Sequence, residues 1–147
     1  MRRFIFRLEH VLNVRRAKEE AALAELAAAR RALALEQMTL EQRRARARRA
    51  LQEARKRRME GEDPALAAWL TAFLEALEDD VRLQEERVRQ AEEEVQSRLQ
   101  AALEAMKERK AMEKLRERRL AEHLAEAARE DIRAMDEAAA LRVVSAA

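Results

Sequence analysis

The sequence contains no cysteine, and its 147 residues include only one glycine, Gly61, and one proline, Pro64. Without cysteine the chain has neither a disulfide nor a thiolate that could bind metal or attack a substrate. No run approaches the roughly 20 apolar residues of a membrane span. The start, "MRRFIFRLEH", also lacks the apolar stretch of a signal peptide. We therefore expect a soluble, cytoplasmic chain with no membrane insertion.

Aromatic residues are scarce at 3%, whereas charged residues make up 41% of the chain. The hydrophobic share of 48% is carried mainly by alanine. Alanine favours a helix but has little side chain to bury, so a thick core is not expected. Such a composition is typical of long helices and coiled coils. The expected fold class is all-α.

Charge divides the chain into two parts. Residues 1–60 hold 17 Lys and Arg against 8 Asp and Glu, a net charge of +9, and residues 61–147 hold 14 against 21, a net charge of −7. The boundary falls at the stretch that contains Gly61 and Pro64. The pattern favours a basic segment and an acidic segment that pair with each other.

Apolar residues recur at steps of three and four on both sides of this boundary, which indicates two amphipathic helices. We expect helix one over about residues 5–60 and helix two over about residues 65–143. Four charged residues interrupt the stripe of helix one: Arg15, Glu19, Glu36 and Arg43. The stripe of helix two starts at Leu66 and becomes less regular after Met106.

The segment "EGEDP" combines a helix stop with a helix start. Gly61 suits the left-handed residue that ends a helix, Asp63 suits an N-cap, and Pro64 suits the first helical position. A turn at residues 61–64 then predicts one antiparallel coiled-coil hairpin over residues 1–147, in which residue i faces about residue 125 − i. The basic run Arg43–Arg58 would face residues 67–82 and their acids.

Two further features follow from this register. Helix two is longer, so about 20 residues, roughly His123 to Val144, overhang the start of helix one and are expected to dock on a partner. The apolar arc between Trp69 and Val81 is wider than one helix seam requires. Part of this arc, including the single tryptophan, is interpreted as a partner groove near the turn.

Residues for catalysis are nearly absent. There is no glycine-rich phosphate loop and no nucleophile motif, and no cofactor is expected. His10 and His123 could meet across the hairpin, but two histidines without a placed third ligand do not predict a metal site. We expect no catalytic residue, and hence a protein that is not an enzyme.

Two other function classes remain open from the residues. The arginine run Arg43–Arg58 is compatible with a basic helical adaptor for nucleic acid. The acidic partner helix would cancel most of its field, and no aromatic residues interleave it for base stacking, so nucleic-acid binding is not favoured. A self-associating structural coiled coil is the second alternative.

Four motifs in order resemble the flagellar export protein FliJ family. These are "FIFRLEHVLNVRR" (Phe4–Arg16), "WLTAFLEALEDDV" (Trp69–Val81), "KAMEKLRERR" (Lys110–Arg119) and "MDEAA" (Met135–Ala139). Met112 stands where the family usually has leucine. The resemblance covers nearly the whole chain and implies an antiparallel coiled coil of the type III flagellar export apparatus.

The resemblance also implies partners. Family members associate with the hexameric flagellar export ATPase at the terminal end and with the export-gate membrane protein through the coiled coil, and they assist export chaperones. The residues matched to the ATPase side are Phe4, Phe6, Leu8, Met135, Asp136 and Glu137. Those matched to the gate side are Trp69, Phe73, Leu77, Asp80 and Gln84, with Asp80 at a position that is often small and apolar in the family.

Each assignment has a simpler structural interpretation. Phe4, Phe6 and Leu8 would also fit as core residues that close the hairpin against residues 112–120. Trp69 and Phe73 would fit as core residues near the turn. Asp136 and Glu137 would fit as a solvated helix end.

Overall fold

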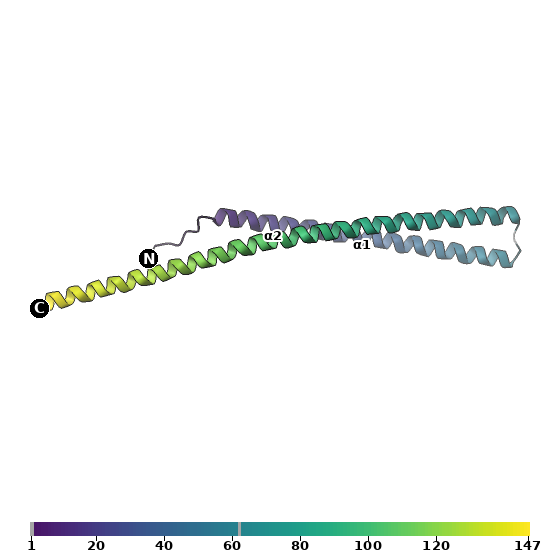
Figure 1. Ribbon diagram of the computed structural model, residues 1–147. Coiled ribbons are helices and arrows are strands. Elements are labelled where there is room, and N and C mark those ends of the chain that lie inside the picture. Colours follow the sequence, from purple (N-terminus) through teal and green to yellow (C-terminus); the bar gives the residue numbers. More distant parts are fainter. Residues whose placement is uncertain (1, 62) are drawn as a thin grey trace. The chain divides into compact units, whose positions relative to one another are not determined.

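The computed structural model of the protein describes residues 2–61 and 63–147. Over these residues it consists of two helices and no strand: α1 (Glu9–Met59) and α2 (Pro64–Ala146) (Figure 1). The chain divides into two compact units. The terminal unit comprises Met1–Glu20 and Leu103–Ala147, and the turn unit comprises Ala21–Ala102. Neither helix, over the described residues, has an apolar stretch sufficient to span a bilayer.

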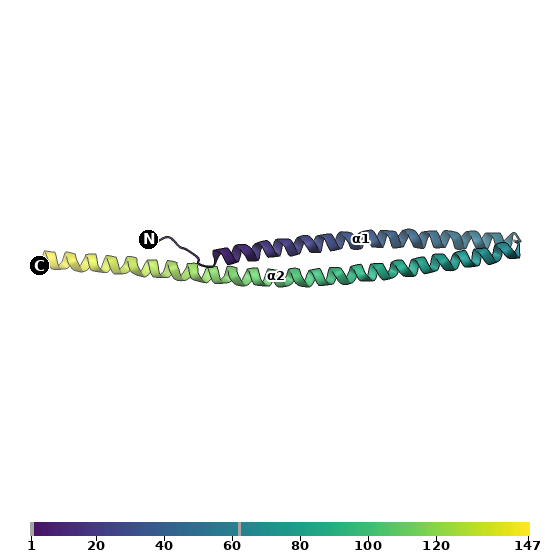
Figure 2. The same ribbon diagram turned by 90° about the horizontal axis from the view of Figure 1, so that it is seen from above.

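In the turn unit, α1 and α2 lie side by side and antiparallel, as both views show (Figures 1 and 2). The chain reverses where the sequence predicts it. Gly61 has a φ of 80°, in the left-handed region that only glycine adopts without strain. Its amide donates to the carbonyl of Arg58 at 3.3 Å, which satisfies one of the last carbonyls of α1.

The start of α2 has the predicted cap. Asp63 accepts a hydrogen bond from the Ala65 amide through Oδ1 at 3.4 Å, and its carbonyl accepts from the Ala67 amide at 3.0 Å. Pro64 is the first helical residue, where its missing N–H leaves no bond unmade. The other residue of the predicted turn, Glu62, lies outside the described residues.

A continuous stripe of α1 faces α2 in each unit. Its positions follow one another at alternating steps of three and four, and all are buried or half-buried: Leu12, Arg15, Glu19, Ala22, Leu26, Ala29, Leu33, Glu36, Leu40, Arg43, Ala47, Ala50 and Ala54. The core is thin, as the composition predicts. Most of its buried apolar residues belong to the turn unit: Leu26, Ala29, Leu40, Ala54, Leu77, Val88 and Ala102.

The charged residues that interrupt this stripe all pair with α2. Because they lie in the seam, each is partly or largely removed from water, and a partner on α2 offsets the cost of that desolvation. The four pairs are Arg15 with Glu108, Glu19 with Arg109, Glu36 with Gln84, and Arg43 with Asp80. The interruptions therefore act as polar links of the helix pair.

The predicted register is confirmed by these and other contacts. In the cross-helix ion pairs of the described residues, the two residue numbers add to between 123 and 129. The all-α antiparallel hairpin is thus the observed fold class. Each of these pairs joins residues of the same unit.

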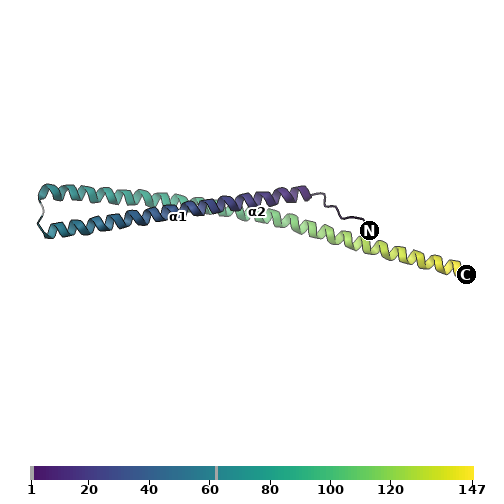
Figure 3. The ribbon, with the colours of Figure 1, turned by 180° about the vertical axis from the view of Figure 1, so that it is seen from behind.

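Both helix bounds differ from expectation. α1 begins at Glu9 instead of about residue 5, and α2 continues to Ala146 instead of about residue 143. The late start has a local cause. The Glu9 amide donates to the carbonyl of Phe6 at 3.1 Å, and this turn directs residues 2–8 away from the axis of α1 and alongside α2 (Figure 3).

Candidate partner-binding surfaces

Residues 2–8, here called the N-terminal strap, lie on α2 in the terminal unit without forming a helix. Their burial alternates along the chain. Phe6 is 8% exposed and Phe4 is half-buried, whereas Ile5 between them is 78% exposed. Alternation of this kind is expected of an extended segment with one face against the protein. Leu8, at the end of the strap, is 40% exposed.

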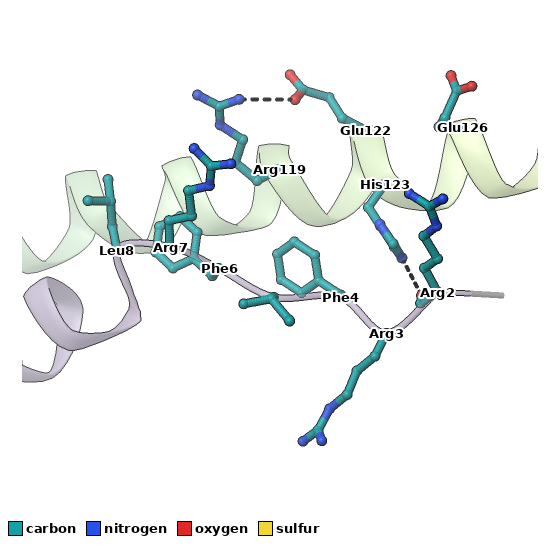
Figure 4. A pocket seen from close by; sticks show the side chains of 11 residues that line it. Arg2, Arg3, Phe4, Phe6, Arg7, Leu8, Arg119, Glu122, His123 and Glu126 are labelled. Atoms are coloured by element: carbon teal, nitrogen blue, oxygen red, sulfur yellow. Dashed lines mark hydrogen bonds and ion pairs between the residues drawn. The ribbon is translucent and has the colours of Figure 1, made fainter.

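Two residues of α2, His123 (Figure 4) and Arg116, hold the strap. His123 donates from Nε2 to the backbone oxygen of Arg2 at 2.9 Å, and its ring lies 5.6 Å from the ring of Phe4, tilted by 51°. The guanidinium of Arg116 lies 5.6 Å from the centre of the Phe4 ring, a cation–π arrangement. Arg116 also donates to Glu9 at 3.0 Å, so it connects the strap to the first turn of α1.

Sequence reasoning missed His123 and Arg116 as partners of the strap. The usable signal was the short alternating run "FIFRL", in which Phe4, Phe6 and Leu8 share one face of an extended segment. The expected helix one, over about residues 5–60, instead includes most of this run. Phe4 and Phe6 do cover α2, but as part of an extended segment.

An open groove of about 880 Å³ remains between the strap and α2 (Figure 4). Its walls carry four arginines and two glutamates as well as apolar side chains: Arg2, Arg3, Phe4, Ile5, Phe6, Arg7, Leu8, Arg119, Glu122, His123 and Glu126. The charged groups that line the groove are therefore predominantly basic. A groove of this composition suits an acidic surface with an apolar contact.

The end of α2 is uncovered within the terminal unit. Every residue from 128 to 147 is exposed, including five large apolar residues with 58% to 74% exposure: Ile132, Met135, Leu141, Val143 and Val144. Asp136 and Glu137 are exposed as well. The uncovered end thus begins at residue 128, instead of about residue 123. The strap explains this difference, because an extended residue advances about 3.3 Å and a helical one only 1.5 Å.

The terminal unit is also held by a network of ion pairs. Arg15 contacts Glu108 at 2.5 Å, and Arg109 contacts both Glu19 at 2.5 Å and Glu113 at 2.8 Å. Hydrogen bonds from Arg109 lower the pKa of Glu19 and the pKa of Glu113, and Arg15 does the same to the pKa of Glu108. The two glutamates that face Arg109 in turn raise its pKa. These carboxylates are therefore charged and paired at neutral pH.

Near the turn, the five residues matched to the gate side fall into two groups. Trp69 is 60% exposed and stacks on the half-buried Phe73, with ring centres 5.4 Å apart and planes at 6°. Leu77 is 6% exposed and Gln84 is fully buried, so both lie in the seam. Asp80 accepts from Arg43 at 2.7 Å. Among these five residues, the Trp69–Phe73 stack presents the exposed apolar surface.

The basic run of α1 is paired less with α2 than expected. Arg43 and Arg44 contact Asp80 and Glu85 across the seam. Other ion pairs stay within one helix: Arg48 with Glu41, Arg57 with Glu53, and Arg82 with both Glu78 and Asp79. Over the described residues, no ion pair is found for the exposed Arg46, Arg49, Arg55 and Lys56. The acidic helix therefore leaves part of this basic surface unneutralised.

The two histidines are used separately. His123 binds the strap, whereas His10 is exposed on the first turns of α1. Over residues 2–61 and 63–147, no cluster of three or more histidine, cysteine or carboxylate side chains could hold a metal ion.

Comparisons with known proteins agree with this fold. The family model described as flagellar FliJ protein matches residues 4–147. No curated protein matches the sequence significantly. A solved structure, that of a putative YscO homologue from Chlamydia trachomatis, resembles the chain with a TM-score of 0.57 and 24% identity. The match covers 95% of this chain and 94% of the homologue's chain. That likeness shows a shared fold.

Proposed function

The chain belongs to the FliJ family of flagellar export proteins, whose model matches it from residue 4 to residue 147, and on that premise we propose a two-ended connecting role. As a member of this family it is associated with type III protein export. In the proposed role it is a cytoplasmic, non-enzymatic stalk or escort that reaches the membrane through its partners. The terminal unit binds the hexameric export ATPase, and the turn unit binds the export-gate membrane protein. Export chaperones are further partners.

The observation that carries the ATPase side is the uncovered end of α2. Twenty successive residues, 128–147, are exposed and include Ile132, Met135 and Val143. An isolated helix end with such side chains gains little stability by itself, so a partner that buries them would stabilise it. Phe4, Phe6 and Leu8 lie in the same unit, beside this helix.

The gate side is supported by the Trp69–Phe73 stack. A stacked aromatic pair with its tryptophan 60% exposed offers a rigid apolar anchor, which is the kind of residue that dominates protein interfaces. Leu77 and Gln84 are buried in the seam, and Asp80 is paired with Arg43, so none of these three side chains is free for a partner. In the intact hairpin we therefore assign direct contact to Trp69 and Phe73.

A pair of complementary variants tests the two ends. The end variant, Met135→Ala with Asp136→Ala and Glu137→Ala, changes only exposed residues and should keep its helix content. It should bind the purified ATPase at least ten-fold more weakly and stimulate its hydrolysis less, while binding of the gate protein's soluble domain is unchanged. The turn-unit variant, Trp69→Ala, should weaken binding of the gate protein's soluble domain and leave binding of the ATPase unchanged. Equal loss of both partners in either variant would contradict separate binding ends.

The unneutralised arginines favour nucleic-acid binding as a second candidate function. If this is the role, binding of a short DNA or RNA duplex should weaken steeply between about 50 and 200 mM salt. Substituting Arg46, Arg49 and Lys56 by glutamine should then reduce both the affinity and its salt dependence. Negligible binding at about 50 mM salt would eliminate this candidate. A single monomeric mass at high concentration in analytical ultracentrifugation would likewise eliminate a self-associating coiled coil.

A further inference from the structure

The N-terminal strap conceals the surface that the proposed ATPase side requires. Phe6 is 8% exposed and Phe4 is half-buried, and the Phe4 ring lies against Arg116 and His123 of α2. The exposed end of α2 begins at residue 128, directly after this covered part. A partner that advances along α2 from its free end would therefore meet the strap first.

We propose that the strap is a displaceable cover, which must leave α2 before the export ATPase can engage Phe4, Phe6 and the α2 face beneath them. This inference rests on the proposed function and assigns a regulatory step to the same site. Release of residues 2–8 extends the free surface of α2 from residue 128 back to Arg116. It also frees two aromatic side chains for contact with the partner.

The contacts of the strap are few for a segment of its length. One side chain, Phe6, is buried, and one hydrogen bond, from His123 to the carbonyl of Arg2, connects it to α2 beyond the Phe4 ring contacts. The open groove of about 880 Å³ leaves part of the space between the strap and α2 unfilled. Ordering seven residues costs conformational entropy that so few contacts offset only in part.

Charge also weakens the docked state. The strap contains three arginines and no acid, and over the described residues none of the three forms an ion pair. Arg7 and Arg119 both line the groove, and Arg119 is itself only weakly paired with Glu122, at 3.9 Å (Figure 4). Neighbouring guanidinium groups repel each other. A partner with an acidic rim around an apolar pocket would relieve this repulsion and accept Phe4 or Phe6, so it would favour release.

A covalent lock tests the proposal in the full-length chain. Because the protein has no cysteine, Arg2→Cys with Glu126→Cys creates two unique sites across the groove, which a short bis-maleimide joins. The matched control, Arg44→Cys with Glu85→Cys, replaces another Arg–Glu set and locks the helices of the turn unit without touching the strap. Affinity for the purified ATPase should fall at least ten-fold in the locked strap variant relative to its unlinked form. The control should change less than two-fold when it is linked.

Unchanged affinity for the ATPase after locking would overturn the proposal. If both the wild-type protein and the unlinked variant fail to bind the ATPase, the proposed function is contradicted instead. A second measurement does not depend on the partner. Spin labels at positions 2 and 126 should report two distances in the free protein, docked and released, and Phe6→Ala should raise the released fraction at least three-fold. A docked distance alone in both proteins would refute a displaceable strap. With the ATPase added in excess, the released distance should predominate.

Discussion

The seam between α1 and α2 contains one polar contact whose removal should make the protein more stable. Gln84 is fully buried, and its Nε2 donates two hydrogen bonds to Glu36. One goes to the Glu36 carboxylate and the other, at 3.0 Å, to the Glu36 backbone oxygen. Its Oε1 is buried and has no hydrogen-bond partner. We predict that Glu36→Leu with Gln84→Leu raises the free energy of unfolding by about 2 kcal/mol.

The magnitude follows from the contacts that are lost and gained. Removing Gln84 abolishes the cost of its unpaired buried oxygen, about 1–3 kcal/mol. A leucine of similar size at position 84 contributes about 1.5–3 kcal/mol by burial, and one at the half-buried position 36 contributes less. Against these gains stand the two bonds of Nε2, worth about 0.5–1.5 kcal/mol for the bond to the backbone oxygen and about 1.5–3 kcal/mol for the bond to the charged carboxylate. The carbonyl of Glu36 keeps its place in the hydrogen-bond ladder of α1.

Urea unfolding followed by circular dichroism measures this difference. The matched control is Gln100→Leu, the same chemical change at an exposed position of α2, which should alter stability by less than about 0.5 kcal/mol. Both variants should have the same association state as the wild type in analytical ultracentrifugation, so that a gain in stability cannot come from association. A double variant less stable than the wild type would refute the reasoning and show that the Glu36–Gln84 contact is a net source of stability.

Three further predictions concern the terminal unit and the turn. Leu12→Ala should lower the free energy of unfolding by about 3 kcal/mol, since Leu12 is fully buried. In chemical denaturation, the control Leu23→Ala, at an exposed position, should lower it by less than about 1 kcal/mol. The pKa of Glu19 lies below its ordinary value of 4.5 in the folded state, so its stabilising contribution is present above pH 4.5 and is lost as the pH falls through the lowered value. Thermal unfolding between pH 7 and pH 3 should therefore show a smaller acid-induced decrease in Glu19→Gln than in the wild type, and an identical decrease would contradict a paired carboxylate. Gly61→Ala should lower the free energy of unfolding by about 1–2 kcal/mol through backbone strain alone, because φ is 80° and no atom lies within 4 Å of the added methyl group. Gly61→Asn should lower it less, and an alanine variant as stable as the wild type would show that the turn relaxes.

Most of the hairpin could be predicted from short-range rules. Gly61, Asp63 and Pro64 each have a conformational preference strong enough to specify the turn, and they act there as expected. The register follows from geometry once the turn is placed, because both helices advance by the same rise per residue. The heptad steps predicted which residues of α1 face α2, including the charged residues that interrupt the stripe.

The candidate sites were predicted less completely. The match to the gate side combined the exposed Trp69 with the buried Gln84, because positions on a helix do not reveal how wide the seam is. The strap was missed because "FIFRL" is too short to outweigh a helical pattern. Its extended form depends on the contacts of Phe4 with Arg116 and His123, more than a hundred residues away in the chain.

The sequence by itself determined the two helices and the place of the reversal, because helix propensity, capping and periodicity act over a few residues. Only the tertiary structure decided which charges reach a partner. In the tertiary structure Arg43 pairs with Asp80 and Arg46 is exposed, because the direction of each side chain relative to α2 sets its distance from an acid. The tertiary structure also decided that the first residues cover α2 as a strap and that α2 is free only from residue 128. Such contacts join distant segments, and their energies depend on burial that no local pattern encodes.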